Sequence, residues 1–214
     1  MRIVVVGAGG LGGPIAMATG AAGADVTIVD PDVVELSNLH RQVQFGGDDL
    51  GAPKATALAA KIVGRGGRAR GRAARFEPGN ADQLAADCDV IVDGSDDPRT
   101  KFVVADWARA RRRAHVIAAA VRYGGNVFTS APGAACYRCL FEDPPDEAPT
   151  CGEAGVLGPL VGWVGGIAAT RALRLGGGDP AVAGTIWIVD DLRTGKAARE
   201  LTLARRHGCA CGAA

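Results

Sequence analysis

Two close pairs of cysteines are the most recognisable chemical groups in this 214-residue sequence. Cys136 and Cys139 are separated by two residues, a spacing at which two thiolates reach one tetrahedral zinc ion. Cys209 and Cys211 offer the other two ligands, and a shared ion would tie this distant segment to the rest of the fold. Because Cys-x-Cys is tighter than the usual spacing, His207 is an alternative ligand. The sequence therefore predicts a structural Zn²⁺ site.

The remaining two cysteines stand apart from these pairs. Cys151 lies in the acidic, proline-rich segment 140–153, just before an apolar stretch predicted to be helical. Near a helix N-terminus its pKa would fall and the thiolate would be a candidate nucleophile, but a passive loop cysteine fits the same position. Cys88 lies between two acids before an apolar strand and is predicted to be structural.

A glycine-rich turn near the start of the chain is typical of a nucleotide site. Gly7, Gly9 and Gly12 fit the pattern G-x-G-x-x-G between a predicted strand and a predicted helix, and Gly10 adds to the turn. Backbone amides and a helix N-terminus at such a turn favour a phosphate. Asp30 ends the second strand, where an acid accepts hydrogen bonds from ribose hydroxyls. A tight turn without a ligand is the alternative.

The run S-N-L-H-R-Q (37–42) distinguishes between kinds of nucleotide. Asn38 and Arg41 are three residues apart and share a face of a helical turn, and Lys54 begins the next predicted helix. An arginine and a lysine that converge on one nucleotide supply charge for phosphates, which fits ATP better than a nicotinamide site. Gln42 closes the run, and we place it in the same site.

The acidic run D-G-S-D-D (93–97) follows an apolar strand, at the edge where ligands bind in open α/β folds. Acids there can hold Mg²⁺ through one or two carboxylates while phosphates supply other ligands. Asp97 followed by Pro98 also fits a simple helix start. The two interpretations can apply to different acids of the run.

The elements that must position these residues alternate along the first 121 residues. Predicted strands and helices lie at 2–7, 11–22, 25–30, 52–63, 68–76, 81–86, 89–93, 98–110 and 115–121. The alternation predicts an α/β, Rossmann-like, doubly wound and mostly parallel sheet. After residue 121, a turn at Gly124-Gly125, a strand at 126–131, a helix at 156–175 and strands at 185–190 and 199–204 predict an antiparallel C-terminal part.

Bulk properties exclude several classes of function. The net charge is +1, and the arginine runs at 65–75 and 109–113 lack interleaved aromatic residues, which argues against nucleic acid and favours solvated faces. Met1-Arg2 leads straight into a strand, so no signal peptide is expected. The apolar run 154–170 contains Pro159 and falls short of the roughly 20 residues of a membrane span. We expect a cytoplasmic protein without a membrane partner, with this helix buried or in a dimer interface.

These blocks together resemble the ThiF/MoeB/HesA adenylyltransferases, bacterial relatives of ubiquitin-activating enzymes. The matching blocks stand in the family's order and span nearly the whole chain: G-A-G-G-L-G, D-P-D-V-V-E-L-S-N-L-H-R-Q, Lys54, D-G-S-D-D, C-Y-R-C-L and T-C-G-E-A-G-V-L-G-P. The resemblance implies a homodimer that adenylates, with ATP, the C-terminal glycine of a small ubiquitin-like sulfur-carrier protein ending in Gly-Gly. We expect a single domain over 1–214, with a nucleotide-binding half (1–121) and a carrier-binding and zinc half (122–214).

The same resemblance implies roles for individual residues. Asp30 would hold the ribose, Asn38, Arg41 and Lys54 the phosphates, and Asp96 the Mg²⁺. The carrier carboxylate attacks the α-phosphate and releases pyrophosphate, so the protein acts mainly by positioning and charge neutralisation.

Three features qualify the resemblance. Members usually carry an N-terminal helical extension whose arginine reaches the partner subunit's ATP, whereas this sequence opens on its first strand, as a short form would. Members have two residues between the second pair of thiols, where this sequence has one. Cys151 matches a position where some members form a persulfide or thioester and others need no cysteine; the former behaviour adds a sulfur-donor protein as a partner.

Three alternatives stay open. A tRNA-directed member of the same fold would bind tRNA through the arginine run 65–75. An NAD-dependent oxidoreductase would explain Gly7 to Asp30 but would leave Arg41, Lys54 and the cysteine pairs without a role. A non-catalytic ATP-binding scaffold would keep the fold and bind its partner without turnover.

Overall fold

One sheet organises the chain in the computed structural model, which describes residues 1–145 and 154–212. Its strands follow the order β3-β2-β1-β4-β5-β6-β7-β8. The first five in that order are mutually parallel, and β6, β7 and β8 each pair antiparallel. The bounds are β1 Arg2–Val6, β2 Asp25–Val29, β3 Arg68–Arg72, β4 Val90–Asp93, β5 Ala114–Val121, β6 Gly124–Ser130, β7 Thr185–Val189 and β8 Arg199–Thr202. The predicted α/β fold class, with its antiparallel C-terminal part, is confirmed.

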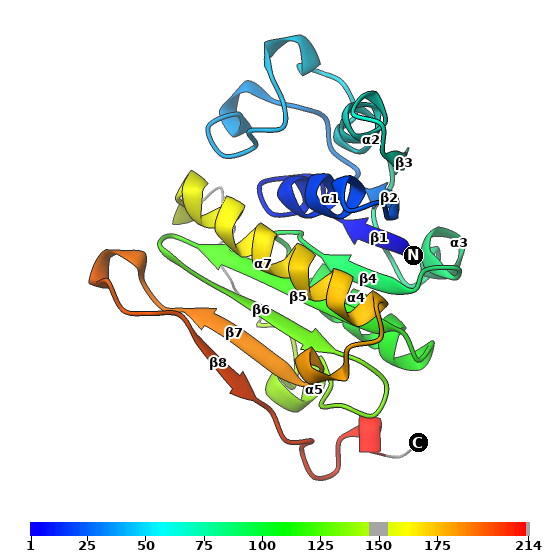
Figure 1. The fold of residues 1–214 in the computed structure, drawn as a ribbon, viewed down its shortest axis with the longest axis vertical. Helices are drawn as coiled ribbons and strands as arrows, with labels where there is room; N and C mark the ends of the chain where they lie inside the picture. Colours follow the sequence, from blue (N-terminus) through cyan, green and yellow to red (C-terminus); the bar gives the residue numbers. More distant parts are fainter. Residues whose placement is uncertain (146–153, 213–214) are drawn as a thin grey trace.

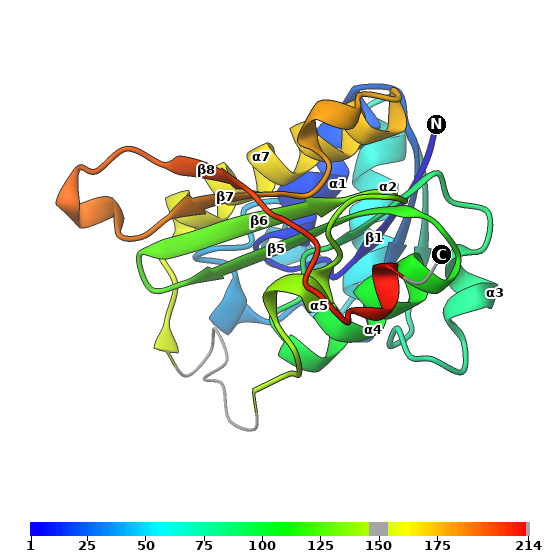
Figure 2. The same cartoon turned by 90° about the horizontal axis from the view of Figure 1, so that it is seen from below.

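Helices cover both faces of this sheet (Figures 1 and 2). The α-helices described are α1 Gly12–Ala21, α2 Lys54–Gly64, α3 Ala81–Ala85, α4 Pro98–Ala110, α5 Tyr137–Leu140 and α7 Gly158–Gly176. Short 3₁₀ turns lie at Leu36–Asn38, Gly47–Asp49, Pro180–Val182, Leu192–Thr194 and Ala210–Gly212. None of the helices within the described ranges combines the length and apolar character needed to cross a membrane.

Two separate apolar cores result from this three-layer arrangement. One lies under α1, α2 and α7, where Ile15, Leu58 and Val164 are buried against the sheet. The other lies under α3, α4 and α5, with Phe102 and Tyr137 among its members. Successive side chains of a strand point to opposite faces, so the β-rich runs supply both cores at once. The sheet is thereby a rigid platform for the loops at its ends.

The hairpin between β5 and β6 differs from the prediction. We expected a turn at Gly124-Gly125, but both glycines lie inside β6, and the chain reverses one step earlier, at Arg122 and Tyr123. A Cβ at Gly124 would overlap the Asp190 carbonyl oxygen, and one at Gly125 would lie 2.8 Å from the carbonyl oxygen of Ala119. The glycines are therefore needed for close strand approach and not for the turn.

The strand order reverses at β1, which pairs with β2 on one side and with β4 on the other. In open α/β sheets, ligands bind in the crevice at the carboxyl ends of the strands at such a point. The glycine turn, Asp30 and the run 93–97 follow β1, β2 and β4 respectively, so all three meet at this edge.

Candidate functional site

The carboxyl ends of β1, β2 and β4 surround a cavity of about 560 Å³. Its wall is built by the glycine turn, the segment after β2, the first residue of α2 and the loop after β4. All but one of the predicted nucleotide-site residues line it, namely Gly7, Gly9, Gly10, Asp30, Asn38, Arg41, Gln42, Lys54 and Asp96. The topology thus brings together residues spread over 90 positions of sequence.

The exception is Gly12, which lies behind the turn at the start of α1. A Cβ there would overlap the carbonyl oxygen of Gly7, so its absence lets the helix pack against the turn. Gly7 itself has φ +93°, a region that side chains disfavour. Gln44, which sequence reasoning missed, donates its Nε2 to the carbonyls of Ala8 (2.9 Å) and Gly9 (3.0 Å). The turn is fixed from both sides by packing and hydrogen bonds.

Asp30 connects this turn to the segment after β2. Its Oδ2 accepts a 2.6 Å hydrogen bond from the Ala8 amide, and its Oδ1 accepts one of 2.8 Å from the Asp32 amide. Burial raises the pKa of this carboxyl, while the two amides and Lys54 act in the opposite direction. Each carboxylate oxygen keeps acceptor capacity beyond these bonds, as recognition of ribose hydroxyls requires.

Two cations face the cavity from different elements. Lys54 opens α2 and is only 6% exposed, with its Nζ 3.1 Å from Asp32 Oδ2. Arg41 donates its Nη2 to Asn38 Oδ1 at 2.7 Å, so the expected shared face of these residues is observed. Gln42 is 3% exposed, and its Oε1 has no hydrogen-bond partner among the described residues. A buried acceptor without a partner, in the wall of a cavity that two cations also line, is typical of a polar-ligand site.

Arg75 is a third cation on this wall, and sequence reasoning had placed it on a solvated face. Asp97, which lines the same cavity, caps α4 by accepting hydrogen bonds from the amides of Arg99 and Thr100 (both 3.1 Å). Its pKa lies below the usual value because these bonds, that from the Thr100 hydroxyl and the charge of Arg75 outweigh the effect of burial. Asp97 is thus the helix-start residue of the acidic run.

A buried ion pair supports the loop that carries Asp96. Asp93, at the end of β4, is fully buried, and Lys101 Nζ lies 2.7 Å from its Oδ2. Lys101 also donates to the carbonyls of Ser95 (2.6 Å) and Ala118 (2.8 Å). Burial raises the pKa of Asp93, and the contacts with Lys101 and Ser95 lower it by a smaller amount. Asp96 itself is exposed at the cavity wall, so its carboxylate is accessible for a hard cation.

A second cavity, of about 660 Å³, adjoins the first because Leu11, Ser95 and Asp96 line both. Its other walls are the β5–β6 hairpin and the segment after β7, where the Arg193 guanidinium lies 4.1 Å from the Tyr123 ring centroid. The two cavities therefore meet at Asp96.

The four paired cysteines form one cluster at the start of α5, which we call the thiol cluster. The Sγ atoms of Cys136 and Cys139 are 3.9 Å apart, those of Cys136 and Cys209 3.6 Å, and those of Cys139 and Cys211 3.3 Å. A tetrahedral zinc with Zn–S bonds of about 2.3 Å holds its sulfurs roughly 3.8 Å apart. The ligand atoms of all four lie within 4.8 Å of one another, so this donor set fits the metal.

Three other expectations concern His207, Cys88 and Cys151. His207 is exposed and is not part of the thiol cluster. Cys88 is buried, and burial raises the pKa of its thiol to about 12, as suits a structural residue. Cys151 lies outside the described residues.

Residues 1–212 match the ThiF family. The SAMP-activating enzyme E1 of Haloferax volcanii is 41% identical over 179 residues, covering 81% of this chain and 66% of that protein. The sulfur carrier protein adenylyltransferase of Thermus thermophilus is 38% identical over 224 residues, with 98% and 82% covered. The adenylyltransferase and sulfurtransferase MOCS3 of Caenorhabditis briggsae is 35% identical over 220 residues, with 98% and 54% covered. The chain thus spans less than two thirds of two of these relatives.

The fold is also that of solved structures. The crystal structure of E. coli MccB with AMPCPP and SeMet MccA superposes with a TM-score of 0.82 at 18% identity, covering 98% of this chain and 66% of that one. At this identity the likeness establishes the fold alone.

Proposed function

Since the chain belongs to the ThiF family over residues 1–212, we propose that it adenylates the C-terminal glycine of a small ubiquitin-like sulfur-carrier protein at the expense of ATP. The observation that carries the proposal is the convergence of Asp30, Arg41, Lys54 and Asp96 on one cavity at the switch point of the sheet. Relatives at 38% and 41% identity are named for carrier activation, which agrees with this assignment.

The nucleotide would occupy the first cavity, at the carboxyl ends of β1, β2 and β4, which on this proposal we call the nucleotide cavity. Asp30 would accept from the ribose hydroxyls, and the glycine turn and the N-terminus of α1 would face phosphate. Arg41, Asn38 and Lys54 would bind the phosphate oxygens through charge-assisted hydrogen bonds. The orphan acceptor of Gln42 would take a hydrogen bond from a nucleotide hydroxyl or amine.

The carrier tail would enter through the second cavity, which opens beside the β5–β6 hairpin and meets the first at Asp96. A carboxylate oxygen of the terminal glycine attacks the α-phosphorus, and the α–β phosphoanhydride bond breaks with its electron pair on pyrophosphate. Arg41 and Lys54 stabilise the negative charge on the phosphates, a positioning and electrostatic role. Mg²⁺, held by Asp96, would supply further neutralisation of the phosphates.

Pyrophosphate exchange tests this function. Wild-type protein with a cognate carrier ending in Gly-Gly is expected to exchange labelled pyrophosphate into ATP. Arg41→Ala and Asp96→Ala should each lose on the order of 2–4 kcal/mol of transition-state stabilisation. Arg99→Ala removes a nearby exposed charge outside the cavity wall and should keep full activity. Absence of exchange with every cognate carrier, or equal loss in the Arg99 variant, would refute the assignment.

We further propose that the thiol cluster holds one structural Zn²⁺, because four thiol ligands fill every tetrahedral position. The ion would fix the start of α5 to the turn at residues 210–212. Elemental analysis should find about one zinc per chain, and Cys209→Ser should lower that content. Protein purified without zinc but with unchanged thermal stability would contradict the proposal.

A homodimer is proposed from the exposed edge of α7 and the residue before it, where one part of the Trp163 ring packs against Trp187 of β7. Leu157 and Trp163 are 40% and 41% exposed, and Gly162 and Gly166 have open space beside them. Large apolar side chains next to glycines suit close packing against a second helix. Light scattering should give twice the chain mass, and Trp163→Glu should give the monomer; a wild-type monomer at micromolar concentration would refute this.

A further inference from the structure

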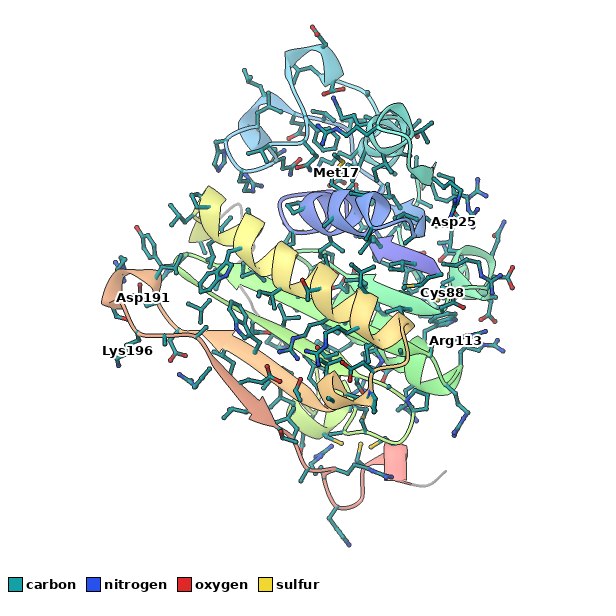
Figure 3. The ribbon with its side chains drawn as sticks, viewed as in Figure 1. Met17, Asp25, Cys88, Arg113, Asp191 and Lys196 are labelled. Carbon is teal, nitrogen blue, oxygen red and sulfur yellow. The ribbon has the colours of Figure 1, made fainter. Side chains whose placement is uncertain are left out.

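A third cavity, of about 450 Å³, lies at the opposite end of the sheet from the nucleotide cavity. It is placed where β5 begins and β6 ends, beside the end of α4. Figure 3 shows Arg113 at this end of the molecule and Asp191, which follows β7, at the other. Four arginines and one buried histidine line it: Arg109, Arg112, Arg113, Arg205 and His115. The solvated face predicted for the run 109–113 holds for Arg111 and Arg112, which are exposed, whereas Arg109 and Arg113 are half-buried.

The arginines of this cavity have no carboxylate partner within the described ranges. Its lining includes no aspartate or glutamate, and no ion pair of the described residues involves any of the four arginines. The Nε atoms of Arg109 and Arg113 are buried and lack a partner among the described groups. Neighbours outside the cavity behave differently, since Arg111 pairs with Asp82 and Arg138 with Asp106. Arg113 Nη2 donates to the carbonyl oxygen of Ala86 at 2.9 Å, so this guanidinium is anchored while its Nε–H has no acceptor among the described residues. Buried guanidinium N–H groups without an acceptor indicate a missing anion.

His115 adds a second, independent polar group. It is 2% exposed, and its Nε2 is buried without a partner among the described residues, while Nδ1 lies 3.4 Å from the Arg113 carbonyl oxygen. Burial lowers the pKa of this ring to about 4, so it is neutral at physiological pH. A neutral imidazole can accept a hydrogen bond from a protonated phosphate oxygen or donate one to an ionised oxygen.

The neighbouring thiol cluster does not account for this charge. Cys136 and Cys211 line the same cavity. Four thiolates with one Zn²⁺ carry a formal charge of −2, whereas the four arginines carry +4, so a surplus of +2 remains after full compensation. A dianion would balance that surplus.

We propose that this cavity binds a small phosphate-bearing anion, either a phosphate monoester or free phosphate, held by Arg109, Arg113, Arg205 and His115. Arginine forks match phosphate oxygens in pairs, and the volume lies in the range of small-ligand pockets. A polynucleotide fits less well, because no Phe, Tyr or Trp side chain lines the cavity for base stacking.

Calorimetric titration of the full, zinc-loaded protein tests the site, with glycerol 3-phosphate and inorganic phosphate as separate probes at constant ionic strength. Arg109→Gln and Arg205→Gln should each weaken binding roughly tenfold or more. Arg111→Gln removes the same charge from the same end of α4 but lies outside the cavity, and should bind as wild type. Arg205 is exposed, so its variant keeps the fold; zinc content and melting temperature verify this.

The two probes distinguish an organic phosphate ester from free phosphate, and the variants distinguish binding in this cavity from binding in the nucleotide cavity. Tighter binding of glycerol 3-phosphate would identify an organic ester, and equal affinity would identify the free anion; both support the site. Because the nucleotide cavity can also take phosphate, the titration is repeated with Arg41→Ala, in which the binding that Arg109→Gln and Arg205→Gln weaken should persist. No saturable binding, equal weakening in the Arg111 variant, or loss of binding in the Arg41 variant would each overturn the proposal.

Discussion

Replacing Lys101 by methionine isolates the ion pair beneath the nucleotide cavity. Methionine keeps the length and apolar stem of the side chain but removes the ammonium that contacts Asp93 at 2.7 Å. Asp93 is fully buried and would keep only its hydrogen bonds from Ser95, of which the hydroxyl bond is 2.7 Å. The carbonyls of Ser95 and Ala118 would also lose a donor. The variant therefore leaves a buried carboxylate without its cation.

Removing one partner of a buried pair costs about 3–5 kcal/mol, because the other charge stays desolvated. For a domain with total stability of roughly 5–15 kcal/mol this is a large fraction. With a urea m-value of about 3 kcal/mol/M, the unfolding midpoint should fall by roughly 1 to 2 M. The loop 94–97 should loosen as well, so adenylation by the folded variant should drop through misplacement of Asp96.

The loss should depend on pH in a defined direction. The pKa of Asp93 is raised above 3.8 in the folded protein, mainly by burial. Between pH 3.8 and the pKa of Asp93 in the folded protein, this carboxyl is more protonated in the folded state than in the unfolded state. The free energy of unfolding therefore falls as pH rises through this range. Lys101 lowers the pKa of Asp93, so removing Lys101 raises this pKa further and extends the pH range over which stability falls. The cost of Lys101→Met should therefore be larger at about pH 8 than at about pH 5.5.

Urea unfolding followed by circular dichroism measures both effects. The matched control is Lys61→Met, which breaks a 2.8 Å pair with Asp49 at the surface and should cost at most about 1 kcal/mol. In the double variant Asp93→Asn with Lys101→Met, most of the pH dependence of the cost should vanish. Equal losses for Lys101→Met and Lys61→Met, or a loss independent of pH, would refute the reasoning.

Three further outcomes follow from the fold. Gly12→Ala should unfold the domain or cost several kcal/mol of stability, because its Cβ would overlap the Gly7 carbonyl. The control Gly47→Ala, with open space around its Cβ, should change stability by less than about 0.5 kcal/mol. Thermal melts compare the two variants. Chelation of zinc should lower the melting temperature, and added zinc should restore it; a chelator without effect would count against the metal. Cys88 should resist iodoacetamide at neutral pH in folded protein, because its thiol is buried with a pKa of about 12; mass spectrometry that finds rapid labelling would contradict this.

Local pattern predicted most of the fold because hydrophobic periodicity and glycine placement are local properties. The predicted helix 98–110 coincides with α4, whose Asp97 and Pro98 form a helix start readable from sequence alone. The nucleotide-site residues could be grouped because each follows a strand or begins a helix at one edge of a parallel sheet.

The supporting residues were not predictable in the same way. Lys101 lies inside a helix, and nothing in its neighbourhood shows that it reaches Asp93 and the carbonyl of Ala118. Gln44 contacts the glycine turn from more than 30 residues away. Arg109 and Arg113 belong to a run that looks solvated, and only the packing of the end of α4 beside the start of β5 brings them next to His115. Each depends on tertiary contacts that no local signal encodes.

The thiol cluster also determines how the sheet can come apart. Cys136 and Cys209 are 73 residues apart, and the segment between them contains α7, β7 and β8. A cross-link that closes a loop of this length removes about 4 kcal/mol of chain entropy from the unfolded state, by the relation used for disulfides. Loss of the metal should therefore lower the free energy of local unfolding of β7 and β8. The amides of the parallel strands around the nucleotide cavity should stay protected from hydrogen exchange. Hydrogen exchange would then show two cooperative units where the metal-loaded chain shows one.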